Sequence, residues 1–330
     1  MQYRWLGRTG VKVSRLALGT MCWGGDADEG SSAAMFARAR EAGVNFIDTA
    51  DVYNGGRSEE MLGRFMGRAR DELVIATKAY FPTGQDPNAR GASRFHLVRA
   101  VEASLRRMQT DRVDLFYLHR WDDETAIEET LRALDDLVRA GKILYPACSN
   151  FAAWQVAHAL GVAAARGLAP IVAVQPMYNL VKRQAEVEIL PSARALGVAV
   201  VPYSPMAGGM LSGKYTGGAS PAGARFTYNK MYQTRYADQA YWAAAEAFAA
   251  LAGDIGRAPG TLAVAWVASH PAVTSVLVGA RSVEQLETSL AAADLELDHE
   301  TRAKISALTP EPPPATDRNE ERTPDNYGAR

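Results

Sequence analysis

Few features of this sequence suggest a disulfide-rich, metal-binding or membrane protein. The chain of 330 residues has only two cysteines, Cys22 and Cys148, which lie far apart and form no C-x-x-C pair. Neither a disulfide framework nor a zinc site is indicated, and two free thiols in a reducing compartment are expected. The sequence contains no run of roughly 18 uncharged apolar residues, which a membrane span needs, and MQYRWLGRTG lacks a signal peptide's apolar run. We expect a soluble, cytoplasmic protein without a metal.

The sequence also lacks an excess of charge of either sign. It has 36 Lys and Arg residues against 37 Asp and Glu residues, a formal net charge of −1 at pH 7. A general nucleic-acid binder would need a basic excess, so we expect no nucleic-acid partner. Any anionic ligand must be held by local groups. Since 48% of the residues are hydrophobic, the chain can bury a large core, although its length alone allows one domain or two.

Short apolar runs alternate with helical patterns along nearly the whole chain. The runs are often β-branched and end at a polar residue or a glycine, which is typical of strands buried on both faces. Most follow one another at intervals of about 30 residues, the size of one strand–helix unit. Eight such runs can be counted, and they end before Thr20, Asp48, Lys78, His119, Ser149, Gln175, Tyr203 and Gly279.

Helix signals lie between the apolar runs. We expect helices to begin at Ser31, Ser58 and Ser93, and a fourth helix to end at Gly141. This alternation indicates an α/β protein with a parallel sheet, and eight units favour a closed (β/α)8 TIM barrel. An open doubly wound sheet is the alternative fold, but no G-x-G-x-x-G follows any of the expected strands.

Two long segments interrupt the regular spacing, one before His119 and one before Gly279. They contain YFPTGQDPNARGA and PMAGGMLSGKYTGGASPAGARF, and the second is expected to be a long mobile loop followed by additional helix. Both follow a strand, so both should be long loops at the C-terminal, catalytic face. An N-terminal β-hairpin is expected around Gly7 and Gly10. Residues 1–330 are interpreted as one domain, whose Pro-rich charged tail, 309–330, is either disordered or laid over the surface.

Several of the expected strand ends carry groups suited to catalysis. Barrel enzymes take their chemistry from these ends, and here they include Asp48, Lys78 and His119, with Tyr53 in the loop after Asp48. Each residue alone has an ordinary explanation, such as a solvated strand end or a packed aromatic ring. Together they place an acid, a base, a cation and an anion at one mouth of one barrel. Such a combination arises by chance much less often than any one of these residues alone.

The motifs around these residues resemble those of the aldo-keto reductases. FIDTADVY looks like the acid-and-tyrosine motif of that family, VIATK like its lysine motif and DLFYLHR like its histidine motif. CSNF, VQPMYN, VPYSPMAGGMLSGKY and VLVGARSVEQLETSL resemble its cofactor-binding segments in the same order. The resemblance runs from about Tyr3 to Leu308, and is strongest to the bacterial branch related to potassium-channel β subunits.

The resemblance implies an NADPH-dependent oxidoreductase that reduces aldehydes or ketones to alcohols by hydride transfer. Tyr53 would be the general acid that protonates the carbonyl oxygen. Because a free tyrosine has a pKa of about 10, Lys78 would have to lower the pKa of Tyr53 by its positive charge. Asp48 would pair with Lys78 and fix its position. His119 would orient the carbonyl.

The same resemblance implies the contacts at the nicotinamide end of the cofactor. Ser149, Asn150 and Gln175 would bind the carboxamide, and Tyr203 would stack on the nicotinamide ring. The glycines of the segment after Tyr203 would let the backbone approach the pyrophosphate. The further cofactor residues are Thr20, Ser204, Met206, Gly208, Lys214 and Gly279.

Arg225 and Arg281 are candidates for the adenosine end of the cofactor. Arg281 precedes an expected helix start, where an anion could use both its guanidinium and the helix N-terminus. Gln285 lies one turn further along. These residues favour NADPH over NADH. Where relatives commonly show Glu-Asn, this chain has Thr288 and Ser289, which puts the adenine contacts in doubt.

The substrate pocket is expected to be aromatic and apolar. An apolar pocket would accept aldehydes and ketones broadly, and the sequence shows no clamp for a phosphorylated substrate. Two other functions stay open: a regulatory subunit that holds the cofactor as a redox sensor, and a lyase that uses Lys78 as a Schiff base. The oligomeric state stays open too. The candidate substrate residues are Trp23, Tyr80 and Trp121, with Met21, Phe81, Met177 and Tyr178 near them.

Overall fold

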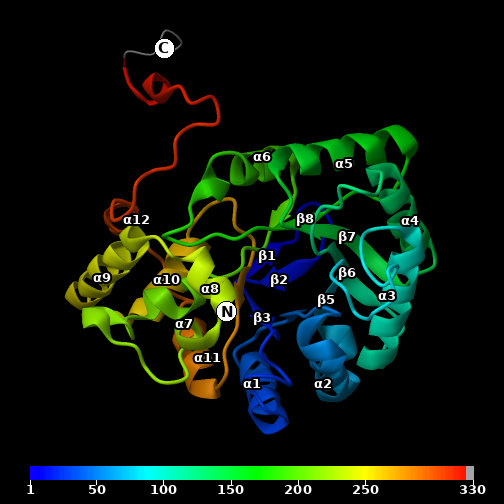
Figure 1. Cartoon of the computed structure of the whole chain (residues 1–330), viewed down its shortest axis with the longest axis horizontal. Helices are drawn as coiled ribbons and strands as arrows, with labels where there is room; N and C mark the ends of the chain where they lie inside the picture. The colour runs from blue at the N-terminus through cyan, green and yellow to red at the C-terminus, as the bar shows by residue number, and fades with distance from the viewer. Residues whose placement is uncertain (325–330) are drawn as a thin grey trace.

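Eight parallel strands form the centre of the structure, a computed structural model that describes residues 1–324 (Figure 1). Their order is β10-β3-β4-β5-β6-β7-β8-β9. Thr274 N donates to Val200 O at 2.8 Å and Leu277 N donates to Pro202 O at 2.9 Å, which joins β10 to β9 and closes the ring. The (β/α)8 barrel is confirmed, with its strands β3 (Leu16–Gly19), β4 (Phe46–Asp48), β5 (Val74–Ala79), β6 (Val113–Leu118), β7 (Ile143–Ser149), β8 (Ala173–Gln175), β9 (Ala199–Val200) and β10 (Val276–Val278).

The strands are mainly apolar because both of their faces are buried. Successive side chains of a strand point to opposite faces. On β6, Leu115 and Tyr117 belong to the cluster inside the barrel, whereas Phe116 and Leu118 pack in the outer core with the helices. A polar side chain inside such a strand needs a hydrogen-bond partner, as Thr77 of β5 has in Glu59. All eight apolar runs are therefore strands, as expected.

The helices surround the barrel (Figure 1). Ser93 caps α3 by accepting from His96 N, as expected, and α4 ends at Arg139, just before Gly141. Two starts differ: Asp28 caps α1 by accepting from Ser31 N, and α2 begins at Arg57 because the buried Ser58 hydroxyl bonds elsewhere. The helices are α1 (Glu29–Glu41), α2 (Arg57–Met66), α3 (Arg94–Met108), α4 (Ile127–Arg139), α5 (Ala153–Arg166), α6 (Ile189–Leu196), α9 (Gln239–Asp254), α10 (Pro259–Ala268), α11 (Val283–Leu290) and α12 (His299–Ser306).

The expected N-terminal hairpin closes the amino-terminal end of the barrel. Strands β1 (Tyr3–Trp5) and β2 (Lys12–Ser14) pair antiparallel, and Leu6 packs in the inner cluster. Gly7 lies so close to the starts of β8 and β9 that a Cβ would stand 3.0 Å or less from two carbonyl oxygens. With this end closed, a ligand must approach from the carboxyl ends of the strands.

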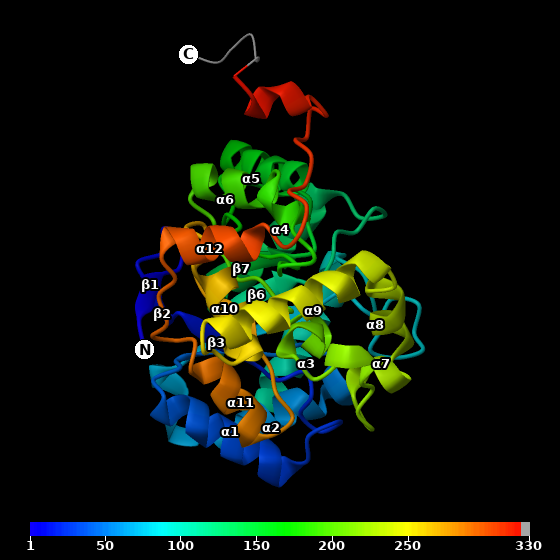
Figure 2. The same ribbon diagram turned by 90° about the vertical axis from the view of Figure 1, so that its left-hand side faces the viewer.

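The insertion after β9 stands at the open end of the barrel. It contains two 3-10 turns, η4 (Ala207–Ser212) and η5 (Thr216–Gly218), and two short helices, α7 (Arg225–Tyr228) and α8 (Lys230–Arg235). The additional helix expected there is present, since α7 and α8 lead into α9 (Figure 2). This segment, 205–238, is called the insertion below.

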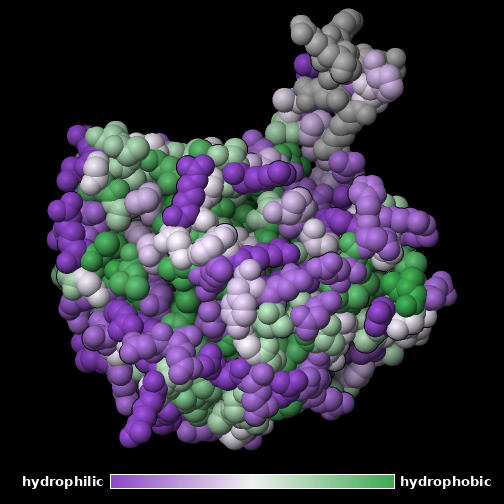
Figure 3. All heavy atoms as spheres, turned by 180° about the vertical axis from the view of Figure 1, so that it is seen from behind, coloured by the Kyte–Doolittle hydropathy of each residue, from purple (hydrophilic) through white to green (hydrophobic). Residues whose placement is uncertain are grey.

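The C-terminal tail follows α12. Residues 309–324 contain one 3-10 turn, η6 (Asn319–Arg322), and extend away from the barrel in Figures 1 and 2. The last part of the expected tail, 325–330, lies outside the described residues. The face in Figure 3 shows mainly hydrophilic residues with smaller hydrophobic patches. Within residues 1–324, no helix is long and apolar enough to cross a membrane, and no three His, Cys, Asp or Glu side chains gather as metal ligands.

Candidate active site

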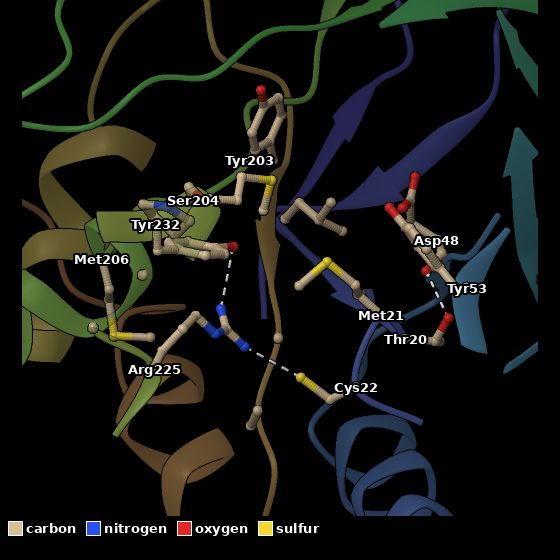
Figure 4. Close-up of a pocket in the computed structure, with 18 of the residues that line it drawn as sticks. Thr20, Met21, Cys22, Asp48, Tyr53, Tyr203, Ser204, Met206, Arg225 and Tyr232 are labelled. Carbon is tan, nitrogen blue, oxygen red and sulfur yellow. Dashed lines mark hydrogen bonds between the residues drawn. The ribbon is translucent and has the colours of Figure 1, made fainter. Parts of the chain in front are cut away.

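A cavity of about 620 Å³ opens at the carboxyl ends of the strands (Figure 4). It lies between these strand ends, the loop after β10 and the insertion. The structure brings the candidates together here: three of the catalytic residues, Asp48, Tyr53 and His119, and every predicted cofactor residue line the cavity. The cofactor candidates are Thr20, Ser149, Asn150, Gln175, Tyr203, Ser204, Met206, Gly208, Lys214, Arg225, Gly279, Arg281 and Gln285.

Lys78 and Asp48 form a buried ion pair at the floor of the cavity. Both side chains are essentially inaccessible to solvent. Lys78 Nζ contacts Asp48 Oδ1 and donates to the Thr49 carbonyl oxygen at 2.7 Å, while Asp48 Oδ2 accepts from Gln175 Nε2 at 2.8 Å. Burial lowers the pKa of Lys78, and the charge of Asp48 opposes that change. The bonds fix the ammonium in one position, because strands β4, β5 and β8 supply all the groups.

Tyr53 stands directly above this pair. It begins the turn η1 (Tyr53–Gly56) after β4, and Asn54 Nδ2 holds that turn by donating to the Met21 and Trp23 carbonyl oxygens. Lys78 Nζ lies 5.3 Å from the centre of the Tyr53 ring. The predicted proximity of the two groups is therefore present.

The pKa of Tyr53 differs from the expectation. Burial and the nearby charge of Asp48 raise the pKa of Tyr53 well above its ordinary value, whereas we expected Lys78 to lower it. Lys78 is paired with Asp48, whose charge also raises the pKa of Tyr53, and the loss of water around the phenol is the largest influence. Tyr53 consequently keeps its proton throughout the neutral range, which is the state that a proton donor needs.

His119 completes the group as a neutral imidazole. Its ring centre lies 6.0 Å from that of Tyr53 and 4.9 Å from that of Phe81. Burial, assisted by the positive charge of Lys78, lowers the pKa of His119 to about 3. Its Nδ1 is buried and has no hydrogen-bond partner among residues 1–324. A neutral imidazole can donate or accept one hydrogen bond at the cavity without introducing charge.

The residues predicted for the carboxamide form a connected set beside His119. Asn150 Nδ2 donates to the His119 carbonyl oxygen at 3.0 Å, and Tyr203 Oη donates to Asn150 Oδ1 at 2.8 Å. Ser149 Oγ donates to the Gln175 carbonyl oxygen at 3.0 Å. Since Gln175 also bonds Asp48, this set is linked to the catalytic floor. It offers amide and hydroxyl groups where a planar carboxamide could bind.

Three cations surround the opposite end of the cavity, and none has a carboxylate within ion-pair distance among the described residues. Arg225 lies over the Tyr232 ring at 4.8 Å and donates to Cys22 Sγ at 3.4 Å (Figure 4). Arg281 donates to the Gly223 carbonyl oxygen at 2.9 Å. Burial, with the charges of Arg281 and Arg225, lowers the pKa of Lys214. Bound phosphate would relieve this mutual repulsion.

The lining residues are compatible with the nicotinamide dinucleotide that the resemblance implies, whose phosphates would lie at the cations and whose nicotinamide would lie at Tyr203. The backbone supports this fit at Gly208, where φ is +72° and a Cβ would stand 2.5 Å from the Tyr232 ring. A side chain there would displace Tyr232 and, with it, Arg225. As predicted, Ser282 caps α11 by accepting from Gln285 N, while Gln285 Oε1 accepts from Arg281 N at 3.2 Å.

None of the three residues predicted for the substrate lines the cavity. Trp23 is fully buried in the core, with its ring centre 5.5 Å from that of Phe65, because the chain turns back toward α1 and α2 after Met21. Tyr80 packs on Phe81, and it is Phe81 that lines the cavity. Trp121 packs against Phe151 and Trp154. Of the neighbouring candidates, Met21 and Phe81 line the cavity, while Tyr178 is buried against Trp266; Met177 is paired with Tyr203.

Several cavity residues were missed because they are recognisable only in the fold. Tyr232 and Arg235 come from α8, and their residue types give no sign of which turn of the insertion faces inward. Arg120 follows His119 directly, and that adjacency was the available signal. The residues not predicted include Val52, Arg120, Met231, Tyr232 and Arg235.

Asp51 is a buried acid next to the catalytic floor that the sequence analysis also missed. It is 3% exposed, and neither of its oxygens accepts a well-aligned hydrogen bond from the described residues. Glu59 lies near it, bonded to Thr77 Oγ1 at 2.5 Å and paired with Arg107 at 2.6 Å. Burial and the charge of Glu59 raise the pKa of Asp51 to about 7.

Comparisons with known proteins agree with this geometry. A sequence model described as the aldo/keto reductase family matches residues 15–310. The chain is 38% identical to the uncharacterized oxidoreductase YrpG of Bacillus subtilis (strain 168), over 94% of this chain and 97% of that protein. It is 36% identical to a probable voltage-gated potassium channel subunit beta of Oryza sativa subsp. japonica, over 96% and 99%. It is 32% identical to Protein tas of Escherichia coli (strain K12), over 93% and 97%.

Proposed function

This chain belongs to the aldo/keto reductase family of oxidoreductases, and from that premise we propose that it reduces aldehydes or ketones to alcohols with NADPH. The observation that carries the proposal is one cavity with Asp48, Tyr53, Lys78 and His119 at one end and three cations at the other. When bound, NADPH supplies the hydride that is added to the carbonyl carbon. We further propose that the protein works in the reducing cytoplasm, where its two cysteines stay free thiols.

The proton for the carbonyl oxygen comes from Tyr53. The raised pKa of Tyr53 keeps the hydroxyl protonated before the reaction. As the proton leaves, Lys78 stabilises the developing tyrosinate, because Asp48 and Thr49 hold the ammonium beneath the ring. His119 donates a hydrogen bond to the same carbonyl oxygen and orients it. A substrate oxygen between Tyr53 and His119 would thus have two neutral donors, and the proton lost from Tyr53 is replaced from solvent.

The preference for NADPH rests on the cations at the far end of the cavity. A pyrophosphate alone carries fewer negative charges than a dinucleotide with an additional 2′-phosphate. Lys214, Arg225 and Arg281 have no carboxylate partner among the described residues. They should therefore stabilise bound NADPH, which has the additional phosphate, more than bound NADH. We propose that Arg281 contacts the 2′-phosphate, because it lies at the N-terminus of α11.

The test is to follow oxidation of NADPH, and separately of NADH, against a panel of aldehydes and ketones. We expect turnover with NADPH, and a loss of about 10²–10⁴-fold in Tyr53→Phe. Binding of NADPH to that variant, followed by tryptophan fluorescence, should be retained because the ring stays. Tyr145→Phe, which removes a hydroxyl from a partly buried tyrosine outside the cavity, is the matched control. A protein that binds NADPH but reduces no carbonyl would refute the proposal.

A redox-sensing regulatory subunit is the second candidate. The observation in its favour is that relatives in rice and Arabidopsis thaliana bear the name of probable potassium channel β subunits. Such a subunit would turn over slowly and would retain its cofactor through gel filtration. Schiff-base chemistry at Lys78 is opposed by its burial and its bonds to Asp48 and Thr49. Borohydride trapping of Lys78 with a carbonyl compound would favour it.

A further inference from the structure

The cavity carries more positive charge than a cofactor needs. Arg120, Lys214, Arg225, Arg235 and Arg281 all line it. Asp48 is the one carboxylate among the described lining residues, and Lys78 neutralises it from below. Three of the five cations stand at the end assigned to the phosphates of the cofactor. The other two, Arg120 and Arg235, have no carboxylate counterion among the residues that the structure describes.

Arg235 lies near the catalytic end of the cavity. It is the last residue of α8, and its guanidinium stands 5.2 Å from the centre of the Tyr232 ring. The next residue, Tyr236, has its hydroxyl 3.9 Å from the sulfur of Met177, and Met177 is paired with Tyr203. Tyr203 in turn donates to Asn150, which donates to the His119 carbonyl oxygen. Arg235 is therefore a neighbour of the residues that surround the proton donor.

The second cation, Arg120, lines the same cavity. It follows His119 at the end of β6 and is exposed at the cavity. Among residues 1–324, neither Arg120 nor Arg235 has a carboxylate within ion-pair distance, and the hydrogen bond that Arg235 makes goes to the Met231 sulfur at 3.6 Å. An arginine that faces a cavity without such a partner can give its bidentate donors to an anionic ligand.

Apolar side chains line the cavity beside these charged groups. The Phe81 ring centre lies 4.9 Å from that of His119, and the Met231 sulfur lies 3.6 Å from Arg235. The same cavity is also lined by Met21 and Val52. A ligand in this space would meet hydrophobic surface along its body and positive charge at its end. No such arrangement would be needed for a neutral carbonyl compound, for which unpaired arginines would be costly to dehydrate.

We propose that the substrate is an aldehyde or ketone that carries a carboxylate or a phosphate group. The anion binds at Arg235 and Arg120, the carbonyl lies at Tyr53 and His119, and the carbon skeleton contacts the apolar walls. This inference rests on the proposed carbonyl reduction. The sequence showed no clamp for a phosphorylated substrate, and these two arginines are the groups that would provide one.

The test compares substrates that differ only in charge. Para-carboxybenzaldehyde and its methyl ester have the same ring and aldehyde, and para-formylphenyl phosphate distinguishes phosphate from carboxylate. We expect kcat/KM with NADPH to be roughly 10-fold higher for the acid than for the ester. Arg235→Gln should remove most of this ratio, mainly through KM. Arg120→Gln should reduce it about threefold, because this arginine is exposed and its charge is screened by solvent.

Two controls separate a binding site from a general effect of charge. Arg257→Gln removes an exposed arginine between α9 and α10, outside the cavity lining, and should preserve the ratio of acid to ester. Arg235→Lys should restore part of it. A readout without turnover is the calorimetric binding of benzoate to the protein saturated with NADP⁺, which should weaken in Arg235→Gln.

The outcomes are distinct. If acid, phosphate and ester are reduced equally well, and Arg235→Gln changes nothing, the inference is wrong while carbonyl reduction stands. If none of the three compounds is reduced, and no other carbonyl compound is, the proposed function fails and this inference fails with it. A preference for the anions that disappears in Arg235→Gln but survives in Arg257→Gln supports the site.

Discussion

The two ends of the cavity are built in opposite ways. At the catalytic end, Asp48 and Lys78 sit on neighbouring strands, are fully buried and have their polar atoms bonded within the barrel. At the far end, Arg225 and Arg281 stand on segments outside the strands and contact rings, a carbonyl and a sulfur. Groups that stabilise charge during a reaction act best when fixed and dehydrated. Groups that hold a ligand can belong to a wall that moves to admit it.

The insertion forms this movable wall of the cavity, and it is attached to the barrel by a few contacts near its tip. Tyr228 Oη donates to Asp26 Oδ2 at 2.9 Å, Arg225 donates to Cys22 Sγ, and Arg281 donates to the Gly223 carbonyl oxygen. These bonds join the insertion to the loops after β3 and β10. The side chains that donate these bonds are exposed or partly exposed, so the tip should open at lower cost than the floor, whereas Tyr232 and Tyr236 of the same segment pack in the core.

The largest expected effect is that of Lys78→Met. It leaves Asp48 buried without its cation, and removing one partner of a buried pair costs about 3–5 kcal/mol of unfolding free energy. Carbonyl reduction should be lost as well. Urea unfolding measures the first effect, and the double variant Asp48→Asn, Lys78→Met is the control, since it should recover most of the stability. A fully stable Lys78→Met protein would show that the floor is not built on this pair.

The next effect concerns Asp51, whose oxygens are buried beside the same floor. Its pKa is about 7 in the folded protein and about 3.9 when unfolded. The folded state therefore binds more protons between these values, and stability falls as the pH rises through this window. Asp51→Asn should remove that loss. The difference in free energy of unfolding between this variant and wild type should therefore shift in favour of the variant by roughly 2–3 kcal/mol from about pH 5 to about pH 8.

Urea unfolding at the two pH values measures this difference. Asp254→Asn, which changes an exposed aspartate at the end of α9, is the matched control and should show the same small effect at both. Several ionisable groups lie near Asp51, and their protonation would change together with that of Asp51. They are Lys78, Glu59, Arg107, Asp48 and Tyr53. A constant difference between wild type and Asp51→Asn would mean that Asp51 is ionised throughout.

The residues at the floor of the cavity could be predicted from the sequence because their positions follow from the burial of the strands. Each strand is mainly apolar because both faces are covered, so the polar residue that ends the apolar run marks the carboxyl end, as at Asp48 and His119. The direction of a side chain after that end depends on where the loop turns, which is why Trp23 was wrongly placed at the cavity. Arg235 could not be predicted at all, since its position depends on how α8 packs against the barrel.

The pKa of Tyr53 shows a second limit of the sequence. A motif names the charged neighbours of a residue but not how completely they cancel or how much water is removed. Lys78 was expected to dominate, whereas its pairing with Asp48 leaves burial as the larger influence. The number and depth of the buried groups have to be known before the direction of such a shift can be given.

A smaller effect is expected at the wall, from Arg281→Ala. The guanidinium is partly exposed, so the stability of the protein without cofactor should change by less than about 0.5 kcal/mol. The dissociation constant for NADPH should rise roughly 10-fold, whereas that for NADH should hardly change. Titration by tryptophan fluorescence measures both. Equal weakening of the two cofactors would reject a role at the 2′-phosphate.

The smallest expected effect is that of Tyr228→Phe, which removes one of the contacts at the tip of the wall. Tyr228 is 49% exposed, so its hydrogen bond to Asp26 competes with water and contributes only about 0.5–1 kcal/mol. That energy acts on the closed wall, so the dissociation rate of NADPH should rise about threefold while unfolding in urea stays the same. Stopped-flow displacement of the cofactor measures the rate. Tyr3→Phe, which removes an exposed hydroxyl at the opposite end of the barrel, is the control. A slower release, or a loss of stability equal to that of a core substitution, would show that the wall is as firmly built as the floor.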